Sequence, residues 1–81
     1  MNTKEIKRLA ETYSHAALEA AIEQHLDQGA NPLYVEDDLE ETLNVLSKAS
    51  YVKQKLEQGA VKDIKEALRL LAGEIRQIQQ V

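Results

Sequence analysis

The chain has 81 residues, a net charge of −4 and no cysteine, so disulfides, thiol catalysis and cysteine-ligated metal centres are excluded. A chain of this length has room for one modest core, and we expect residues 1–81 to form a single domain. Its aromatic residues are three tyrosines and it has one proline, a composition that favours helices over strands or disorder.

Two helices are predicted near the N-terminus. Thr3 is positioned to cap a first helix over about residues 4–12, which should end near Tyr13. Ser14 is then positioned to cap a second helix over about residues 15–28. The apolar face of this second helix is expected to contain Leu18, Ala21, Ile22 and Leu26.

The residues after the second helix break the helical pattern. Gly29 suits the left-handed position that follows a helix, and Asn31-Pro32 biases the chain toward an extended form. Residues 33–35 are apolar, but a single strand would have no partner to pair with. We therefore predict an apolar strap that carries Pro32 and lies across the helices.

A long third helix is predicted over about residues 39–58. The acidic residues 36–38 come directly before it, so one carboxylate can cap the helix while the others favour its positive end. One apolar side consists of Leu39, Leu43 and Leu46, and an adjacent stripe consists of Val45, Ala49, Val52 and Leu56. Together they make a face wide enough for two neighbours, so this helix is expected to be central.

A fourth helix is predicted after Gly59, from Asp63 to near the C-terminus. Asp63 and Glu66 have the spacing of a capping box, in which each side chain accepts from the other residue's backbone amide. Apolar residues then recur at steps of four and three and form a narrow seam, which consists of Ile64, Leu68, Leu71, Ile75 and Ile78. The predicted fold is all-α, a small bundle of about four helices with a Pro-containing strap between the second and third.

The two halves of the chain carry opposite charge. Residues 1–41 contain three basic and ten acidic side chains, which gives a net charge of −7. Residues 42–81 contain seven basic and four acidic side chains, which gives a net charge of +3. The halves can therefore attract one another, within one molecule or between two copies.

Three stretches of the sequence carry a resemblance. They are Ile-Lys-Arg-Leu-Ala at residues 6–10 with Tyr13-Ser14, Val35 with the acidic residues 36–38, and Gly59 followed by residues 63–69. In these stretches the chain resembles a group of small bacterial helical proteins of unknown function. The group is rich in aromatic residues in its third helix, where this chain has only Tyr51. The resemblance implies a helical fold and no functional residues, because the group has no assigned activity.

Two histidines are the most versatile candidate ligands and acid–base groups. His15 and His25 are ten residues apart, about 15 Å along a helix, so they cannot bind one metal together. His25 falls on the apolar stripe of the second helix and is expected to be a shielded, hydrogen-bonded side chain. The alternative function is a small-ligand or metal-dependent enzyme centred on His25 with Tyr34 or Tyr51.

Other catalytic and cofactor chemistries lack their essential residues. The third helix starts with Asp37-Asp38-Leu39 and has no serine of the kind that carries the prosthetic arm of acyl carrier proteins. No Gly-rich phosphate loop or Glu-x-x-His metal motif is present, so we expect no cofactor and no metal. No segment approaches the ~18 consecutive apolar residues of a membrane span, and the charged N-terminus is unlike a signal peptide, so a cytoplasmic protein is expected.

Basic side chains gather on one side of the fourth helix, roughly 130° from its seam. They are Lys62, Lys65, Arg69 and Arg76. Such a stripe can follow phosphates, but the net negative charge argues against nucleic acid. The acidic first half, in the same chain or in another copy, is the favoured partner of the stripe.

The sequence therefore favours a noncatalytic protein–protein interaction module, or a small regulatory or self-associating subunit, that acts through helix-face contacts. The expected contact residues are Leu68, Leu71, Ile75, Ile78, Arg69 and Arg76. Leu68 and Leu71 are also expected to serve the core, whereas Ile75 and Ile78 extend past the reach of the short first helix. A homodimer through this end of the fourth helix is the expected assembly.

Overall fold

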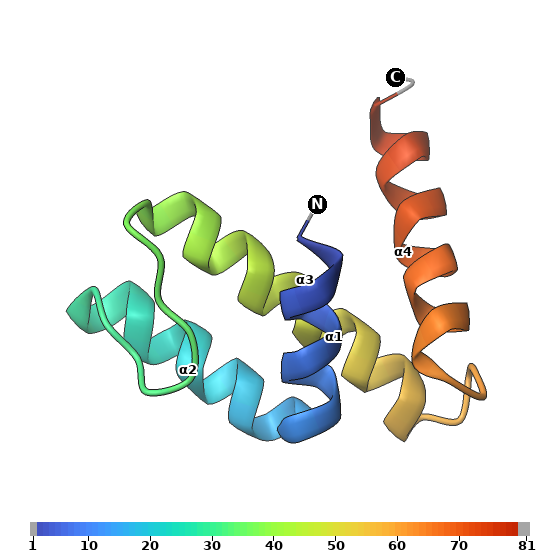
Figure 1. Cartoon of the computed structure of the whole chain (residues 1–81), viewed down its shortest axis with the longest axis horizontal. Coiled ribbons are helices and arrows are strands. Elements are labelled where there is room, and N and C mark those ends of the chain that lie inside the picture. Colours follow the sequence, from blue (N-terminus) through green and yellow to red (C-terminus); the bar gives the residue numbers. More distant parts are fainter. Residues whose placement is uncertain (1, 80–81) are drawn as a thin grey trace.

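The computed structural model describes the backbone of residues 2–79 and the side chains of residues 2–75. Over this range the chain forms helices and no strand, and the predicted all-α, four-helix fold is confirmed (Figure 1). The helices are α1 (Thr3–Thr12), α2 (His15–Gln28), α3 (Leu39–Glu57) and α4 (Ile64–Gln79). None of these helices is long and apolar enough to cross a membrane.

The first two helices are capped by side chains that precede them. Ser14 Oγ accepts from the backbone amide of Ala17 at 3.1 Å, as predicted for the start of α2. The prediction that Thr3 caps α1 is wrong by one residue. Asn2 occupies the cap, its Oδ1 accepts from the amide of Glu5 at 3.4 Å, and Thr3 becomes the first helical residue. Asparagine and threonine are both competent caps, so adjacent candidates compete for this position.

The last two helices begin at carboxylates. Asp38 Oδ1 accepts from the amide of Glu40 at 2.9 Å, and Asp63 Oδ1 accepts from the amide of Glu66 at 2.8 Å. The predicted N-cap of α4 is therefore confirmed, but Glu66 returns no bond to the Asp63 amide. Asp63 is exposed, so water can serve that amide in place of the carboxylate.

The predicted glycine positions are also confirmed. Gly29 after α2 has a φ of +74° and Gly59 after α3 has a φ of +73°, which is the left-handed conformation that glycine adopts without steric cost. Each glycine ends its helix and turns the chain toward the next element.

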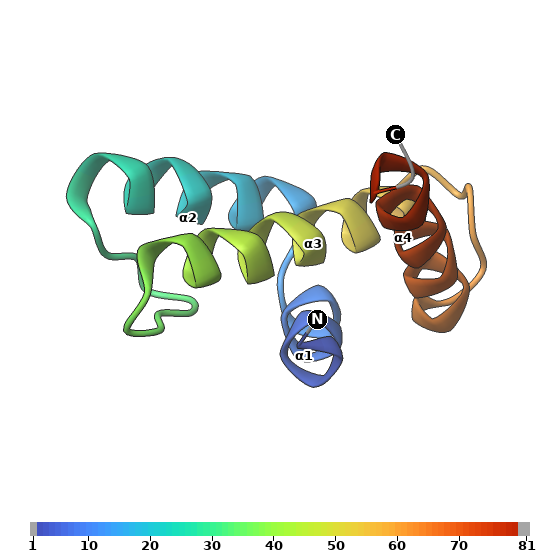
Figure 2. The same ribbon diagram turned by 90° about the horizontal axis from the view of Figure 1, so that it is seen from above.

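Helix α3 is the centre of the fold, as predicted, because it packs against each of the other three helices. It lies side by side with α2 in the opposite direction, while α1 and the connection over residues 29–38 lie on one side of this pair (Figure 2). Helix α4 stands at the C-terminal end of α3, away from the C-terminal end of α2. Over residues 2–75, α3 is therefore its only extensive neighbour.

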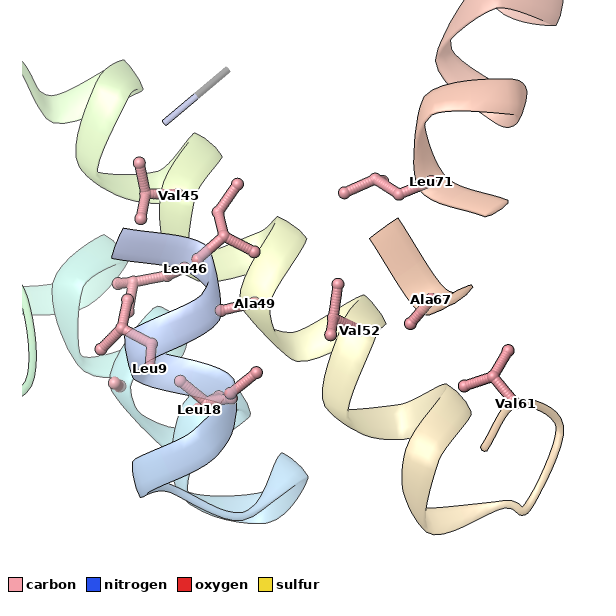
Figure 3. Packing of buried hydrophobic residues seen from close by; sticks show 12 residues of the cluster. Leu9, Leu18, Val45, Leu46, Ala49, Val52, Val61, Ala67 and Leu71 are labelled. Atoms are coloured by element: carbon pink, nitrogen blue, oxygen red, sulfur yellow. The ribbon is translucent and has the colours of Figure 1, made fainter. Parts of the chain in front are cut away.

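The core joins all four helices (Figure 3). Its buried apolar residues are Ile6, Leu9, Ala10, Leu18, Ala21, Val45, Leu46, Ala49, Val52, Val61, Ala67 and Leu71. Two residues predicted on core faces are instead exposed: Leu26 is 65% exposed and Leu39 is 52% exposed. In α2 the place expected for Leu26 is taken by His25, which is 2% exposed because the connection after α2 folds over it and supplies a polar partner.

The connection between α2 and α3 contains Pro32 and covers the core in part. Leu33 and Tyr34 pack against the core cluster, whereas Val35 is 55% exposed. The Thr42 hydroxyl accepts from the amide of Glu36 at 2.8 Å and so fastens the end of the connection to the first turns of α3. The predicted strap is thus made by residues 33 and 34, and Val35 is not part of it.

Candidate interaction surface

Helix α4 is held in place by a small apolar contact with α3. Ala67 and Leu71 are buried, and Val61 in the preceding turn belongs to the same cluster as Val52 of α3. Figure 3 shows Leu71 directed from α4 toward the side where α1 and α3 lie. This contact uses one side of α4, and among the described residues α3 is the one helix against which α4 packs extensively.

The residues predicted as partner contacts fall into three groups. Leu71 is 6% exposed, so it belongs to the protein's own core rather than to an open surface. Leu68 and Ile75 are partly buried at the margin of the core cluster, and Arg69 is exposed. The side chains of Arg76 and Ile78 lie outside the described residues.

Leu68, Ala72 and Ile75 form a continuous margin along α4, because they follow one another at steps of four and three. All three are partly exposed. Lys65 precedes Leu68 by three residues and Arg69 precedes Ala72 by three, so the two exposed cations border this margin along one flank. We call these five residues the α4 edge. It combines an incompletely covered apolar strip with a positively charged flank.

Tyr51 and Glu74 lie where α4 meets α3. Burial, followed by the neighbouring Glu74 carboxylate, raises the pKa of the Tyr51 hydroxyl. The Lys55 ammonium lies 5.3 Å from the centre of the Tyr51 ring, within the range of a cation–π contact. The Tyr51 hydroxyl is buried and has no hydrogen-bond partner among the described residues.

His25 is enclosed and has one polar partner. Its Nδ1 lies 3.1 Å from Asn31 Nδ2, which also donates to the carbonyl of Tyr34 at 2.8 Å. Because an amide nitrogen can only donate, His25 Nδ1 accepts and the imidazole carries its proton on Nε2. The prediction that His25 is a shielded, hydrogen-bonded side chain is confirmed.

The predicted partners of an enzyme centre do not converge on His25. Tyr34 lies near Glu36, Glu5 and Asn2, and its pKa is raised from 10.0 to about 12 by burial and then by the Glu36 carboxylate. Within the described part of the chain, no group of three or more histidine, aspartate and glutamate side chains could hold a metal ion. A shallow depression on α3 is lined by Glu40, Leu43, Asn44 and Ser47, and so does not include His25.

Sequence reasoning missed the exposed apolar residues at the other end of the molecule, Leu26 and Leu39. A signal was available, because Glu19, Ile22 and Leu26 share one stripe of α2 at steps of three and four. A carboxylate on an apolar stripe marks a position at the edge of the core rather than inside it.

Comparison with known proteins adds no functional assignment. No protein family, curated protein or solved structure matches this chain. The resemblance to a group of small bacterial helical proteins therefore stays a prediction, and the function has to be argued from the geometry of the chain.

Proposed function

We propose that the protein is a noncatalytic protein–protein interaction module that binds through the α4 edge. The observation that carries this proposal is the placement of α4, which packs extensively on α3 alone and keeps Leu68 and Ile75 only partly covered. An apolar strip of this kind gains free energy when a partner covers it, and it is the usual contact of helix-face recognition.

The charge beside the strip indicates the chemistry of the partner. Lys65 and Arg69 are exposed along one side, so a partner surface with carboxylates beside apolar side chains would be favoured. Ile78 and Arg76 continue the same sequence pattern, and we propose that they extend the contact. Leu71 would act indirectly, by holding α4 against α3.

The surroundings of His25 support the noncatalytic reading over the enzyme alternative. A catalytic imidazole has to reach a substrate, whereas this one is 2% exposed and already bonded to Asn31. A protein partner also suits the basic stripe better than nucleic acid does, because the chain as a whole is acidic. We further propose that the protein acts in the cytoplasm.

Differential capture tests the proposal. The tagged wild-type chain and a Lys65→Glu, Arg69→Glu variant are used as baits in extract of the native cell, with untagged chain added as one possible prey. Lys7→Glu, at an exposed position of α1, is the control for a change of charge. We expect mass spectrometry to find a protein that is captured by the wild type and by Lys7→Glu but not by the α4 variant. That protein can be the untagged chain itself. Identical prey for all three baits would contradict the proposal.

A further inference from the structure

A second incompletely covered apolar surface lies on the α2–α3 pair. Ile22 and Leu26 are four residues apart on α2, and Leu39 and Leu43 are four residues apart on α3, so each pair shares one stripe of its helix. We call these four residues the α2–α3 patch. Leu26 is 65% exposed and Leu39 is 52% exposed, while Ile22 and Leu43 are partly buried.

Two hydrogen bonds show that the two stripes face each other. Ser50 Oγ of α3 donates to Glu19 Oε2 of α2 at 2.9 Å, and Glu57 Oε2 accepts from the amide of His15 at 2.9 Å. Glu19 shares the α2 stripe with Ile22 and Leu26, because it precedes them by three and seven residues. The α3 stripe contains Ser50 in the same way, seven residues after Leu43.

The direction of the helices then places the leucines. Helices α2 and α3 run in opposite directions (Figure 1), and Glu19 of α2 lies beside Ser50 of α3. Leu26, further along α2, therefore lies beside an earlier part of α3, toward Leu43. The exposed leucines therefore lie at the same end of the helix pair, away from α4 (Figure 2). The two stripes thus border one another along the helix pair, and their exposed leucines meet solvent at that end.

Carboxylates border the patch. Glu40 and Leu43 line the shallow depression on α3 together with Asn44 and Ser47. Glu23 is exposed on α2, one residue after Ile22 and three before Leu26. The α2–α3 patch is thus apolar with an acidic border, whereas the α4 edge is apolar with a basic flank.

We propose that the α2–α3 patch receives the α4 edge of a second copy of this chain. This inference rests on the proposed function and names the partner of the α4 edge. The two surfaces have matching chemistry: leucine and isoleucine meet leucine and isoleucine, while Lys65 and Arg69 meet Glu23 and Glu40. The two surfaces lie at opposite ends of the molecule, so they meet between copies and not within one chain.

In the proposed assembly the contact is reciprocal, so the assembly closes as a dimer. When two copies are related by a two-fold axis, the α4 edge of each lies on the α2–α3 patch of the other, and the contact forms twice. The acidic first half of the chain then faces the basic second half of its partner, and the opposite charges of the two halves attract across both contacts.

Charge exchange between the two surfaces tests this inference. One variant carries Lys65→Glu with Arg69→Glu, the other carries Glu23→Lys with Glu40→Lys, and all four positions are exposed, so the fold should be retained. Lys7→Glu and Glu11→Lys on α1 are the matched controls. Light scattering after size exclusion, at several concentrations, gives the mass, and far-ultraviolet circular dichroism checks the helices.

The expected masses follow from the symmetry of the contact. The wild type and both controls should form dimers of twice 9.1 kDa, whereas each double variant should be a monomer, because like charges then meet in both contacts. An equimolar mixture of the double variants should regain the dimer, since each contact then pairs opposite charges. One chain with all four substitutions should also dimerise.

Three outcomes would overturn the inference: a wild type that is monomeric at every concentration, double variants that remain dimeric, or a mixture that does not associate. The proposed function is judged separately. If the wild type is monomeric but its α4 edge selects another protein in the capture experiment, the self-contact is wrong and the interaction module stands. If replacing Lys65 and Arg69 changes neither the captured proteins nor the mass, both the self-contact and the proposed function are wrong.

Discussion

Asn31 connects the end of α2 to the strap, because its Nδ2 lies 3.1 Å from His25 Nδ1 and also donates to the carbonyl of Tyr34. Asn31 Oδ1 accepts from the amides of Leu33 and Tyr34 at 2.9 and 3.0 Å. One side chain therefore satisfies both the buried imidazole and the turn that starts at Pro32.

Asn31→Ala should lower the free energy of unfolding by about 2 kcal/mol, because it leaves partly buried amides, a carbonyl and the imidazole without their partner. Chemical denaturation measures the change. Asn44→Ala is the matched control, since Asn44 is exposed on α3 and its loss should change stability by less than about 0.5 kcal/mol. Equal effects of the two substitutions would contradict the role assigned to Asn31.

Asp63→Ala should cost about 0.5–2 kcal/mol of stability, the usual range for the loss of an N-cap. The lost contact is the 2.8 Å bond from the Glu66 amide to Asp63 Oδ1. Asp63→Asn keeps an acceptor at the same position and should retain most of the stability. The interpretation fails if both variants unfold at the same denaturant concentration as the wild type.

The stability of the protein should fall as the pH rises from 10 to about 12. The pKa of Tyr34 is raised from 10.0 to about 12 in the folded protein, so above pH 10 the unfolded chain releases a proton that the folded chain keeps. The stability that the raised pKa of Tyr34 contributes is fully present below pH 10 and is lost as the pH rises through about 12. Thermal unfolding at several pH values measures it, and Tyr34→Phe should make the decline less steep. An unchanged decline in the variant would argue against this cause.

The purified, tag-free protein should contain no stoichiometric metal, and a chelator should leave its unfolding transition unchanged. The reason is that His25 has an amide as its polar partner and no converging carboxylates. Elemental analysis decides the point. Bound metal that disappears in His25→Ala would show that the enzyme alternative is the better interpretation.

The boundaries of the helices could be predicted because they depend on neighbouring residues. Ser14, Asp38 and Asp63 each bond to an amide two or three residues further along the chain, and Gly29 adopts a left-handed conformation that needs no distant contact. The choice between Asn2 and Thr3 failed because both residues suit the same local role.

Which side of each helix is buried depends on distant residues, and there the prediction was weaker. His25 replaces Leu26 in the interior because Asn31, beyond the end of the helix, reaches back to it. The α4 edge could be anticipated from the seam of Leu68 and Ile75. The α2–α3 patch could not, because its two stripes are brought together by the packing of helices that are separate in sequence.

Chemical-shift mapping tests the central claim, that the α4 edge is the surface through which the protein binds. Isotope-labelled protein is observed before and after addition of the captured partner, or over a dilution series if the chain captures itself. The account predicts that the amides of Lys65, Leu68, Arg69, Ala72 and Ile75 shift, and that those of Lys65→Glu, Arg69→Glu protein do not. Shifts confined to His25 and Asn31, with α4 unchanged, would contradict it.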